Sequence, residues 1–318
     1  MMMPVISIVT PLYNRAWCIG DCISSAALKG LPVEMIIVDD GSSDASVAEA
    51  KQTVALLGLQ DQVTIVEQPN AGPSAARNRA ASMSRGEWLA FLDSDDLWFP
   101  WTLPKLLEAL SEAHDNVDLI FASGLNFSDL AELDEVKERE LETEVAPNFV
   151  GAVAINPRSR YGACNAIVRR RAFDDLGGFA PELRCAEDTD FFLRVIGEVM
   201  LIRQPILVGM RRSGHESLTG NIPEVVKGFE WMQAGMPRNR YQGKSEDLNN
   251  FLAGSCAYSI RAAFASGYVK TAYQLYFSHL RLLSRTRTRK YLLRLPLTPL
   301  LHLYKPQAYP FRLSPRRR

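Results

Sequence analysis

The sequence predicts an α/β protein with a mostly parallel β-sheet flanked by helices, followed by a helical C-terminal extension. In the first hundred residues, short β-branched runs alternate with segments of helical pattern. Alternation of this kind is typical of a parallel sheet with right-handed crossovers. Beyond about residue 222 the pattern is helical, and 318 residues are enough for one such domain with an appendage.

The expected elements follow one another along the chain. Continuous apolar runs are typical of buried parallel strands and predict strands at 5–10, 34–39, 63–67 and 87–92. Helices are expected between them, at 15–29, 43–57 and 74–84. Two more strands are expected near 163–168 and 199–208. The acid-rich stretch 129–144 is expected to be a solvated helix or a mobile loop that acts as a lid.

Composition excludes several classes of protein. The apolar share of 47% and the charged share of 23% are ordinary for a globular chain and exclude gross disorder. No uncharged apolar run approaches the roughly 18–20 residues of a membrane span. The N-terminus has no basic residue ahead of its short apolar run, so no signal peptide is expected. Five cysteines without a CxxC pair predict reduced structural thiols in a cytosolic protein.

The charges are divided unevenly along the chain. Lysines and arginines number 36, as do the acids, but no acid follows Asp247, and 13 basic residues do. The basic, leucine-rich stretch 281–318 has two interpretations: an amphipathic segment on an anionic membrane surface, or a helical cap with solvated arginines. Nothing else in the chain points to nucleic acid, so no nucleic-acid partner is expected.

Acidic residues follow two of the expected strands. Asp39 and Asp40 follow one strand, and Asp93 and Asp95 follow another. Ligands of parallel α/β sheets bind at the carboxyl ends of the strands, and alternate carboxylates there suit a hard divalent cation. The alternative for the first pair is a polar turn in which an aspartate caps the next helix.

Two more segments carry polar groups that could bind a ligand or act in catalysis. A Gly/Pro loop containing Asn70 and Gly72 enters a helix, whose N-terminus favours a phosphate or a sugar. Arg77 on that helix is either a ligand contact or an internal strut. Glu187 and Asp188 open another helix, where one carboxylate could be a general base, or both could cap the helix.

Five motifs in order resemble those of family 2 glycosyltransferases of the GT-A fold: PLYN (11–14), IIVDDGSSD (36–44), NAGPSAARN (70–78), FLDSDD (91–96), and GGF with AEDTDF (177–179 and 186–191). The resemblance covers residues 4–220. It implies a Rossmann-like GT-A domain with a nucleotide-sugar half (4–96) and an acceptor half (97–220). Residues 221–318 then form the basic helical extension.

The resemblance also implies roles for individual residues. The nucleotide-diphosphate sugar would be bound by Pro11, Tyr13, Asn14, Asp39, Asp40, Asn70, Gly72, Arg77 and Asp93. A divalent cation, Mg²⁺ or Mn²⁺, would be held by Asp95, Asp93 and His215. Asp188 would be the catalytic base with Glu187 as its neighbour, which fits a single displacement that inverts the anomeric carbon.

The function predicted from the sequence is therefore transfer of a sugar to a hydroxyl acceptor. By family analogy the acceptor is a cell-surface polysaccharide or a lipid-linked glycan, and the enzyme works in the cytoplasm, with peripheral contact to the inner face of the cytoplasmic membrane as an alternative. Acceptor choice is expected to lie around residues 161–165 and 184–186. The rival functions are a nucleotidyltransferase and a non-catalytic nucleotide-sugar binding module.

Overall fold

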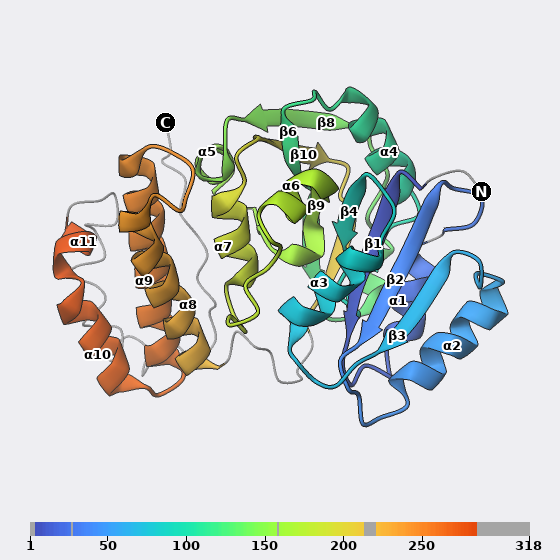
Figure 1. Ribbon diagram of the computed structural model, residues 1–318, viewed down its shortest axis with the longest axis horizontal. Helices are drawn as coiled ribbons and strands as arrows, with labels where there is room; N and C mark the ends of the chain where they lie inside the picture. The colour runs from blue at the N-terminus through green and yellow to red at the C-terminus, as the bar shows by residue number, and fades with distance from the viewer. Residues whose placement is uncertain (1–3, 27, 158, 213–220, 285–318) are drawn as a thin grey trace.

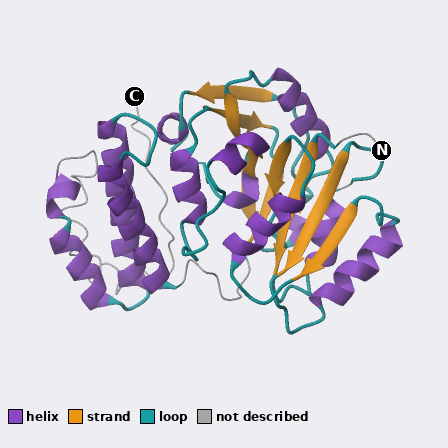
Figure 2. Ribbon diagram, viewed as in Figure 1, coloured by secondary structure: helices purple, strands orange, loops and turns teal. Residues whose placement is uncertain are grey.

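A computed structural model describes residues 4–26, 28–157, 159–212 and 221–284. Within these residues a large twisted sheet runs through the molecule, with helices on both of its faces (Figures 1 and 2). Its strand order is β3-β2-β1-β4-β9-β6-β10-β8. The strands are β1 (Ile6–Leu12), β2 (Val33–Asp39), β3 (Val63–Glu67), β4 (Trp88–Phe91), β6 (Val117–Phe121), β8 (Glu142–Ala146), β9 (Ala166–Arg169) and β10 (Glu198–Gln204).

The predicted mostly parallel sheet is confirmed. Strands β1 to β4 are mutually parallel, and β6 and β10 are parallel to each other. Only β9, inserted between β4 and β6, and β8 at the edge run antiparallel to their neighbours in this sheet, as far as the chain is described. A second, smaller sheet has the order β5-β11-β7 and comprises β5 (Leu97–Trp98), β11 (Val208–Arg211) and β7 (Gly124–Phe127).

Both faces of the sheet are buried, which explains the continuous apolar runs. Successive side chains of a strand point to opposite faces. Val9 and Ile36 belong to the hydrophobic cluster that includes helices α3 (Pro73–Met83) and α7 (Glu187–Arg194). Their neighbours Ile8 and Ile37 belong to the cluster on the other face, with helices α1 (Ile19–Ser25), α2 (Ser46–Leu57) and α4 (Thr102–Glu112). A strand covered on both faces is therefore rich in apolar side chains and shows no alternation of apolar and polar residues.

The C-terminal helices form a layer beside α7 (Figure 1). They are α8 (Ile222–Gly235), α9 (Ser245–Ala265), α10 (Val269–Ser278) and α11 (Leu280–Ser284). Phe229 and Ile260 from these helices share one hydrophobic cluster with Phe192 of α7. Phe251 of α9 also packs edge-on against Phe149 of α5 (Phe149–Ile155), at a centroid distance of 5.7 Å. In the described part of the chain, no helix combines the length and the apolar character that crossing a membrane requires.

Two predicted elements differ from the structure. The acid-rich stretch 129–144 contains a short 3₁₀ helix η1 (Leu130–Leu133), a loop, and then strand β8, rather than a helix or loop throughout. Strand β8 lies at the sheet edge, where charged side chains remain solvated. Its sequence therefore contains acids and lacks the apolar run that predicts a strand. The strand expected over 199–208 is divided, because β10 ends before Pro205 and β11 joins the smaller sheet.

Candidate active site

The acidic motifs meet at one edge of the large sheet. Strands β1, β2 and β4 end there, and the N-termini of α3 and α7 lie at the same edge, at the bottom of the sheet in Figure 1. Helix α3 is fastened to the segment before α7 by Asn78, which accepts the Phe179 N–H at 2.9 Å and donates to its carbonyl at 2.8 Å. The helix that follows the Gly/Pro loop therefore fixes the position of the chain that leads to α7.

Arg77 joins the two acidic motifs across the site. Its Nη2 donates to Asp93 Oδ1 at 2.6 Å and its Nη1 donates to Glu187 Oε1 at 2.9 Å. The Arg77 side chain is 7% exposed, and the two carboxylates raise the pKa of its guanidinium against the effect of burial. Arg77 thus has the position of an internal strut, one of the two interpretations open from the sequence. A direct donor contact by Arg77 stays a prediction.

Asp188 lies at the N-terminus of α7. Its Oδ2 accepts the backbone N–H of Ala163 at 3.2 Å, and its Oδ1 accepts the N–H of Thr189 at 2.6 Å. Burial raises the pKa of the Asp188 carboxyl above its ordinary value, although these hydrogen bonds oppose the shift. Ala163 belongs to the segment 161–165 that is expected to choose the acceptor, so Asp188 faces that segment.

Glu187 shares the buried environment of Asp188. Burial, with repulsion from Asp188, raises the pKa of Glu187 to about 7, while the Arg77 cation opposes the rise. Two adjacent carboxyl groups of raised proton affinity are what acid–base chemistry near neutral pH requires. Glu187 is held by Arg77, whereas Asp188 accepts no side-chain cation among the described residues.

Two of the aspartates after β4 meet Cys164 at a possible cation site, and the expected ligand Asp95 is not in that group. Asp93, Asp96 and the thiol of Cys164 each offer a ligand atom within 4.8 Å of the others. Burial and repulsion from Asp93 raise the pKa of both Asp95 and Asp96. Carboxylates that repel one another in a buried site gain stability from a cation, and oxygen ligands are those that Mg²⁺ and Mn²⁺ prefer. Burial raises the pKa of Cys164 as well. Its soft sulfur suits Mg²⁺ or Mn²⁺ less than oxygen does, so the carboxylates are the fitting ligands.

Two arginines restrain this acidic loop. Arg15 Nε donates to Asp95 Oδ2 at 3.2 Å. Arg211, from β11, donates its backbone N–H to Asp96 Oδ1 at 2.8 Å and its Nε to the Asp95 carbonyl at 3.2 Å. Asp95 is therefore oriented by Arg15, and Asp96 is tied to the smaller sheet. Neither arginine was singled out as a site residue from the sequence, because each lies far along the chain from the aspartates.

Asp40 shapes the Gly/Pro loop from inside the protein. Its Oδ1 accepts the Ala71 N–H and the Gln68 side-chain amide, both at 2.8 Å, and its Oδ2 accepts the Gly72 N–H at 2.8 Å. Asn70 donates its side-chain amide to the Asp40 carbonyl at 2.9 Å. These contacts occupy both carboxylate oxygens. A direct contact from Asp40 to a nucleotide stays a prediction. In the structure, Asp40 positions the Gly/Pro loop.

Asp39 differs from its neighbour. One oxygen, Oδ2, accepts the Ser42 N–H at 3.0 Å, whereas the buried Oδ1 has no hydrogen-bond partner within the described residues. A buried carboxylate oxygen without a donor is costly, and a donor from a bound ligand would satisfy it.

The PLYN motif forms the turn that follows β1. Asn14, with a positive φ of 50°, accepts the Ser43 N–H at 2.8 Å on its side chain and donates its own N–H to the Ser42 hydroxyl at 2.9 Å. Pro11 is partly buried near the end of β1, while the Tyr13 ring is 47% exposed. An aromatic ring held beside the site by a fixed turn offers a stacking face. The remaining metal candidate, His215, lies outside the described residues.

Asp190 is a site residue that the sequence did not assign. It is completely buried and accepts hydrogen bonds from Tyr241 at 2.8 Å, from Trp231 at 3.0 Å and from Arg240 and Arg194, each at 3.0 Å at the shortest. The first three partners belong to the C-terminal helical layer. Asp190 therefore ties the helix that carries Asp188 to the C-terminal helices.

All five cysteines are free, without a disulfide. That they are reduced thiols of a cytosolic protein stays a prediction. The buried thiols of Cys18 and Cys22 contact the backbone carbonyls of Ser94 and Asp93 at 3.5 and 3.6 Å. They support the acidic loop from the α1 side.

Comparison with known proteins agrees with this geometry. Residues 7–177 match Glycosyl transferase family 2, which is more than half of the chain. The chain belongs to this family. It is 24% identical over 253 residues to an uncharacterized glycosyltransferase of Haemophilus influenzae, covering 77% of this chain and 81% of that one. It is 32% identical over 193 residues to the succinoglycan biosynthesis protein ExoO of Rhizobium meliloti, covering 58% of this chain and 53% of the relative.

Solved structures show the same fold. S. aureus TarS 1–349 in complex with UDP-GlcNAc has a TM-score of 0.63 at 18% identity, with 97% of this chain and 94% of that one covered. The mannosyltransferase PcManGT of Pyrobaculum calidifontis, in complex with GDP-Man and Mn²⁺, has a TM-score of 0.54 at 16% identity, with coverage of 97% and 89%. The predicted GT-A fold and glycosyltransferase activity are therefore confirmed, and the family favours sugar transfer over the nucleotidyltransferase alternative.

Proposed function

We propose that this family 2 glycosyltransferase is a metal-dependent, inverting enzyme that moves a sugar from a nucleotide diphosphate to a hydroxyl. The observation that carries the proposal is the placement of Asp188 beside the carboxylates that follow β4, with Arg77 linking Asp93 to Glu187. The carboxylate proposed as the base and the carboxylates proposed as cation ligands belong to one sheet edge, which suits a single in-line displacement of a diphosphate.

The nucleotide would lie against the ends of β1 and β2. The unpartnered Asp39 Oδ1 accepts an N–H from the base or an O–H from the ribose, and Tyr13 offers its exposed ring for stacking. Asn14, Asp40, Asn70 and Gly72 hold the two loops that border this space. Pro11 fixes the chain at the end of β1.

Asp93 and Asp95 would hold a divalent cation together with the donor's diphosphate, with His215 as the third protein ligand. The fit lies in the buried, mutually repelling carboxylates after β4: burial, followed by repulsion from Asp93, raises the pKa of Asp95 and Asp96, and a bound cation would stabilise their charged forms. When bound, the cation supplies charge neutralisation to the leaving diphosphate. Arg15 orients the Asp95 carboxylate that faces it.

Asp188 would remove the proton of the attacking hydroxyl. Its hydrogen bonds from Ala163 and Thr189 hold the carboxylate in place, and its raised proton affinity suits it to accept a proton. Glu187, paired with Arg77, positions α7 rather than reacting. A single base without a protein nucleophile gives one displacement, and the anomeric configuration inverts.

The acceptor would be a growing cell-surface glycan, free or lipid-linked. Relatives named for succinoglycan and teichuronic acid biosynthesis support this class of acceptor. We place the acceptor along the segment 161–165 next to Asp188, in the half of the domain formed by 97–220, while 4–96 binds the donor. No nucleic acid enters this scheme.

The extension 221–318 would also bring the enzyme to an anionic membrane surface on its cytoplasmic side. Phe277 is 63% exposed, and Leu280 and Arg281 follow it at the end of the described chain. Exposed apolar side chains beside basic ones are typical of interfacial segments. Residues 285–318 lie outside the described residues. Equal pelleting of 1–284 and full-length protein with anionic vesicles would contradict a role for the tail.

The stereochemistry of the product tests the proposed reaction. A panel of UDP-, GDP- and dTDP-sugars with Mn²⁺ identifies the donor by release of nucleoside diphosphate, and proton NMR then gives the anomeric configuration of the new bond. We expect inversion relative to the donor, and loss of the release when a chelator removes the cation. A product with the donor's configuration, or full activity in excess chelator, would overturn the proposal.

A further inference from the structure

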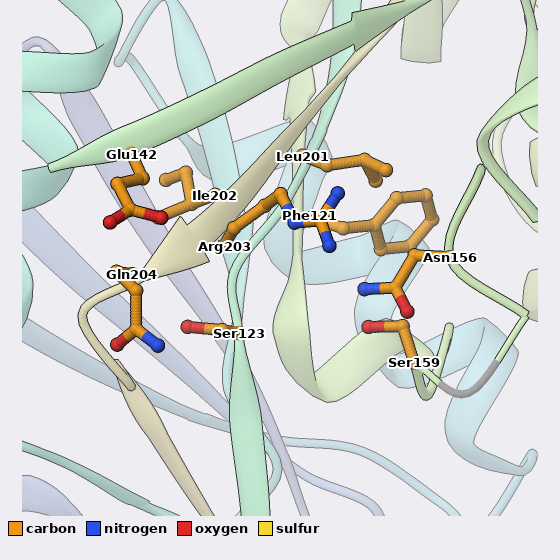
Figure 3. A pocket seen from close by; sticks show the side chains of 9 residues that line it. All are labelled: Phe121, Ser123, Glu142, Asn156, Ser159, Leu201, Ile202, Arg203 and Gln204. Atoms are coloured by element: carbon orange, nitrogen blue, oxygen red, sulfur yellow. The ribbon is translucent and has the colours of Figure 1, made fainter. Parts of the chain in front are cut away.

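A polar pocket lies beside the segment that contacts Asp188, separate from the carboxylates that follow β4. It has a volume of about 240 Å³ and is bordered by the ends of β6 and β10, the start of β8 and the chain after α5. In Figure 3, Asn156 and Ser159 lie on one side of it and Glu142 and Gln204 on the other. The volume is below the roughly 300 Å³ at which drug-sized ligand pockets begin, so it suits a small part of a longer molecule.

The lining is rich in hydrogen-bonding groups. Within the described residues, the side chains of Glu142 and Gln204 make no hydrogen bond or ion pair. Phe121 and Leu201 also border the pocket, but both are almost completely buried in the core. Carboxylate, amide and hydroxyl groups provide donors and acceptors for sugar hydroxyls.

The charges of the pocket disfavour an anion. Arg203 is the positively charged residue of the lining, and it is already paired with Glu144. Glu142 contributes an unpaired negative charge. A phosphate or a carboxylate would therefore meet net repulsion, whereas an uncharged polyhydroxyl segment would find hydrogen-bond acceptors.

Contacts connect this pocket to the catalytic helix. Phe121 packs edge-on against Tyr161 and against Phe192 of α7, at centroid distances of 4.9 and 4.8 Å. Tyr161 donates its hydroxyl to the carbonyl of Asn156 at 2.9 Å. Ser159 precedes Ala163 by four residues, and an extended chain of four residues spans roughly 14 Å at most. Ala163 in turn donates to Asp188, so a short oligosaccharide could reach from the pocket to the base.

We infer that this pocket is an acceptor subsite that binds an uncharged sugar unit of the growing glycan, away from the hydroxyl that is glycosylated. The inference rests on the proposed transfer to a glycan. Glu142 and Gln204 bind the sugar hydroxyls, and the segment 159–163, which ends at the Asp188 contact, sets the distance between the bound unit and Asp188.

Binding of defined neutral tetrasaccharides tests the subsite. Saturation-transfer NMR is recorded on the full chain with cellotetraose, maltotetraose, laminaritetraose and xylotetraose, and with inorganic phosphate as the anionic probe. We expect at least one tetrasaccharide to bind and phosphate not to displace it. Glu142→Ala and Gln204→Ala should each weaken that binding about tenfold, the effect of one hydrogen bond to a charged or polar group.

Glu140→Ala is the matched control, because Glu140 is an exposed acid two residues before Glu142 and outside the pocket lining. It should leave tetrasaccharide binding unchanged. Binding of none of the sugars, displacement by phosphate, or equal binding by the Glu142 and Gln204 variants would each overturn the subsite. The NMR experiment measures sugar binding without turnover. Failure of the subsite therefore shows as absent sugar binding, whereas failure of the proposed transfer reaction shows as absent release of nucleoside diphosphate by the wild-type enzyme.

Discussion

Arg77 and Glu187 form a buried ion pair of 2.9 Å between the helix after the Gly/Pro loop and the helix that carries Asp188. The same guanidinium reaches Asp93 at 2.6 Å. One cation thus sets the spacing between the acidic loop after β4 and the N-terminus of α7. It also engages Glu187, whereas the neighbouring Asp188 has no ion pair with a side chain among the described residues.

Loss of the Arg77 side chain should destabilise the protein strongly. Arg77→Leu leaves Asp93 and Glu187 without their cation in a buried site, and breaking a buried pair from one side costs about 3–5 kcal/mol. Chemical denaturation measures the free energy of unfolding. Arg79→Leu on the same helix is the control, because Arg79 bonds at the surface to the carbonyl of Glu67. Equal stability of the two variants would show that the ion pairs of Arg77 contribute little to the free energy of unfolding.

Asp190 should matter for folding of the C-terminal layer. Asp190→Ala leaves the buried Arg194 and three groups of that layer without their acceptor, so a loss of about 3–5 kcal/mol is expected. Limited proteolysis should cut the chain around residues 236–244 faster than in wild type. The control is Asp174→Asn, because Asp174 is exposed. Cleavage of the Asp190 variant at the wild-type rate would show that Asp190 does not hold the C-terminal helices to α7.

Stability should fall as the pH rises through the range in which Glu187 loses its proton. Burial raises its pKa to about 7 in the folded protein, against about 4.3 in an unfolded chain. Between these values the folded state binds more protons, so the free energy of unfolding decreases with increasing pH. In Glu187→Gln this decrease between pH 5 and 7 should be smaller, as measured by thermal unfolding. If stability decreases with pH as steeply in this variant as in wild type, a group other than Glu187 titrates in this range.

Cation-dependent donor affinity should depend on Asp95. Asp95→Ala removes a proposed ligand, and calorimetric titration with the donor should then give the same weak affinity with and without Mn²⁺. Asp61→Ala, at an exposed position, is the control and should keep the wild-type response to Mn²⁺. A Mn²⁺ effect of wild-type size in the Asp95 variant would rule out this ligand.

The sequence predicts those parts of the fold and site that depend on local pattern. Continuous apolar runs predict the strands from β1 to β4, and the acids that follow them share one sheet edge because parallel strands end together. The role of Asp190, in contrast, does not follow from local pattern. Within AEDTDF, Asp190 resembles the acidic neighbours Glu187 and Asp188, and only its contacts with the distant Arg240 and Tyr241 show that it serves to hold α7.

Pairings between distant segments are the part that local pattern does not encode. Arg15 contacts Asp95, and Arg211 contacts Asp96, across 80 and 115 residues of sequence. Strand β8 escapes detection because an edge strand needs few apolar side chains. The pocket near Glu142 arises from β8, β10 and the chain after α5 together, so no single motif could have indicated it.

The turnover of Asp188→Asn tests the central claim most directly. The amide keeps the shape of the carboxylate but cannot accept the acceptor's proton, so kcat should fall by a factor of about 10²–10⁴. Calorimetric affinity for the donor with Mn²⁺ should stay near the wild-type value, since the role proposed for Asp188 concerns the acceptor and not the donor. Near-normal turnover, or a loss that follows weaker donor binding alone, would contradict Asp188 as the base.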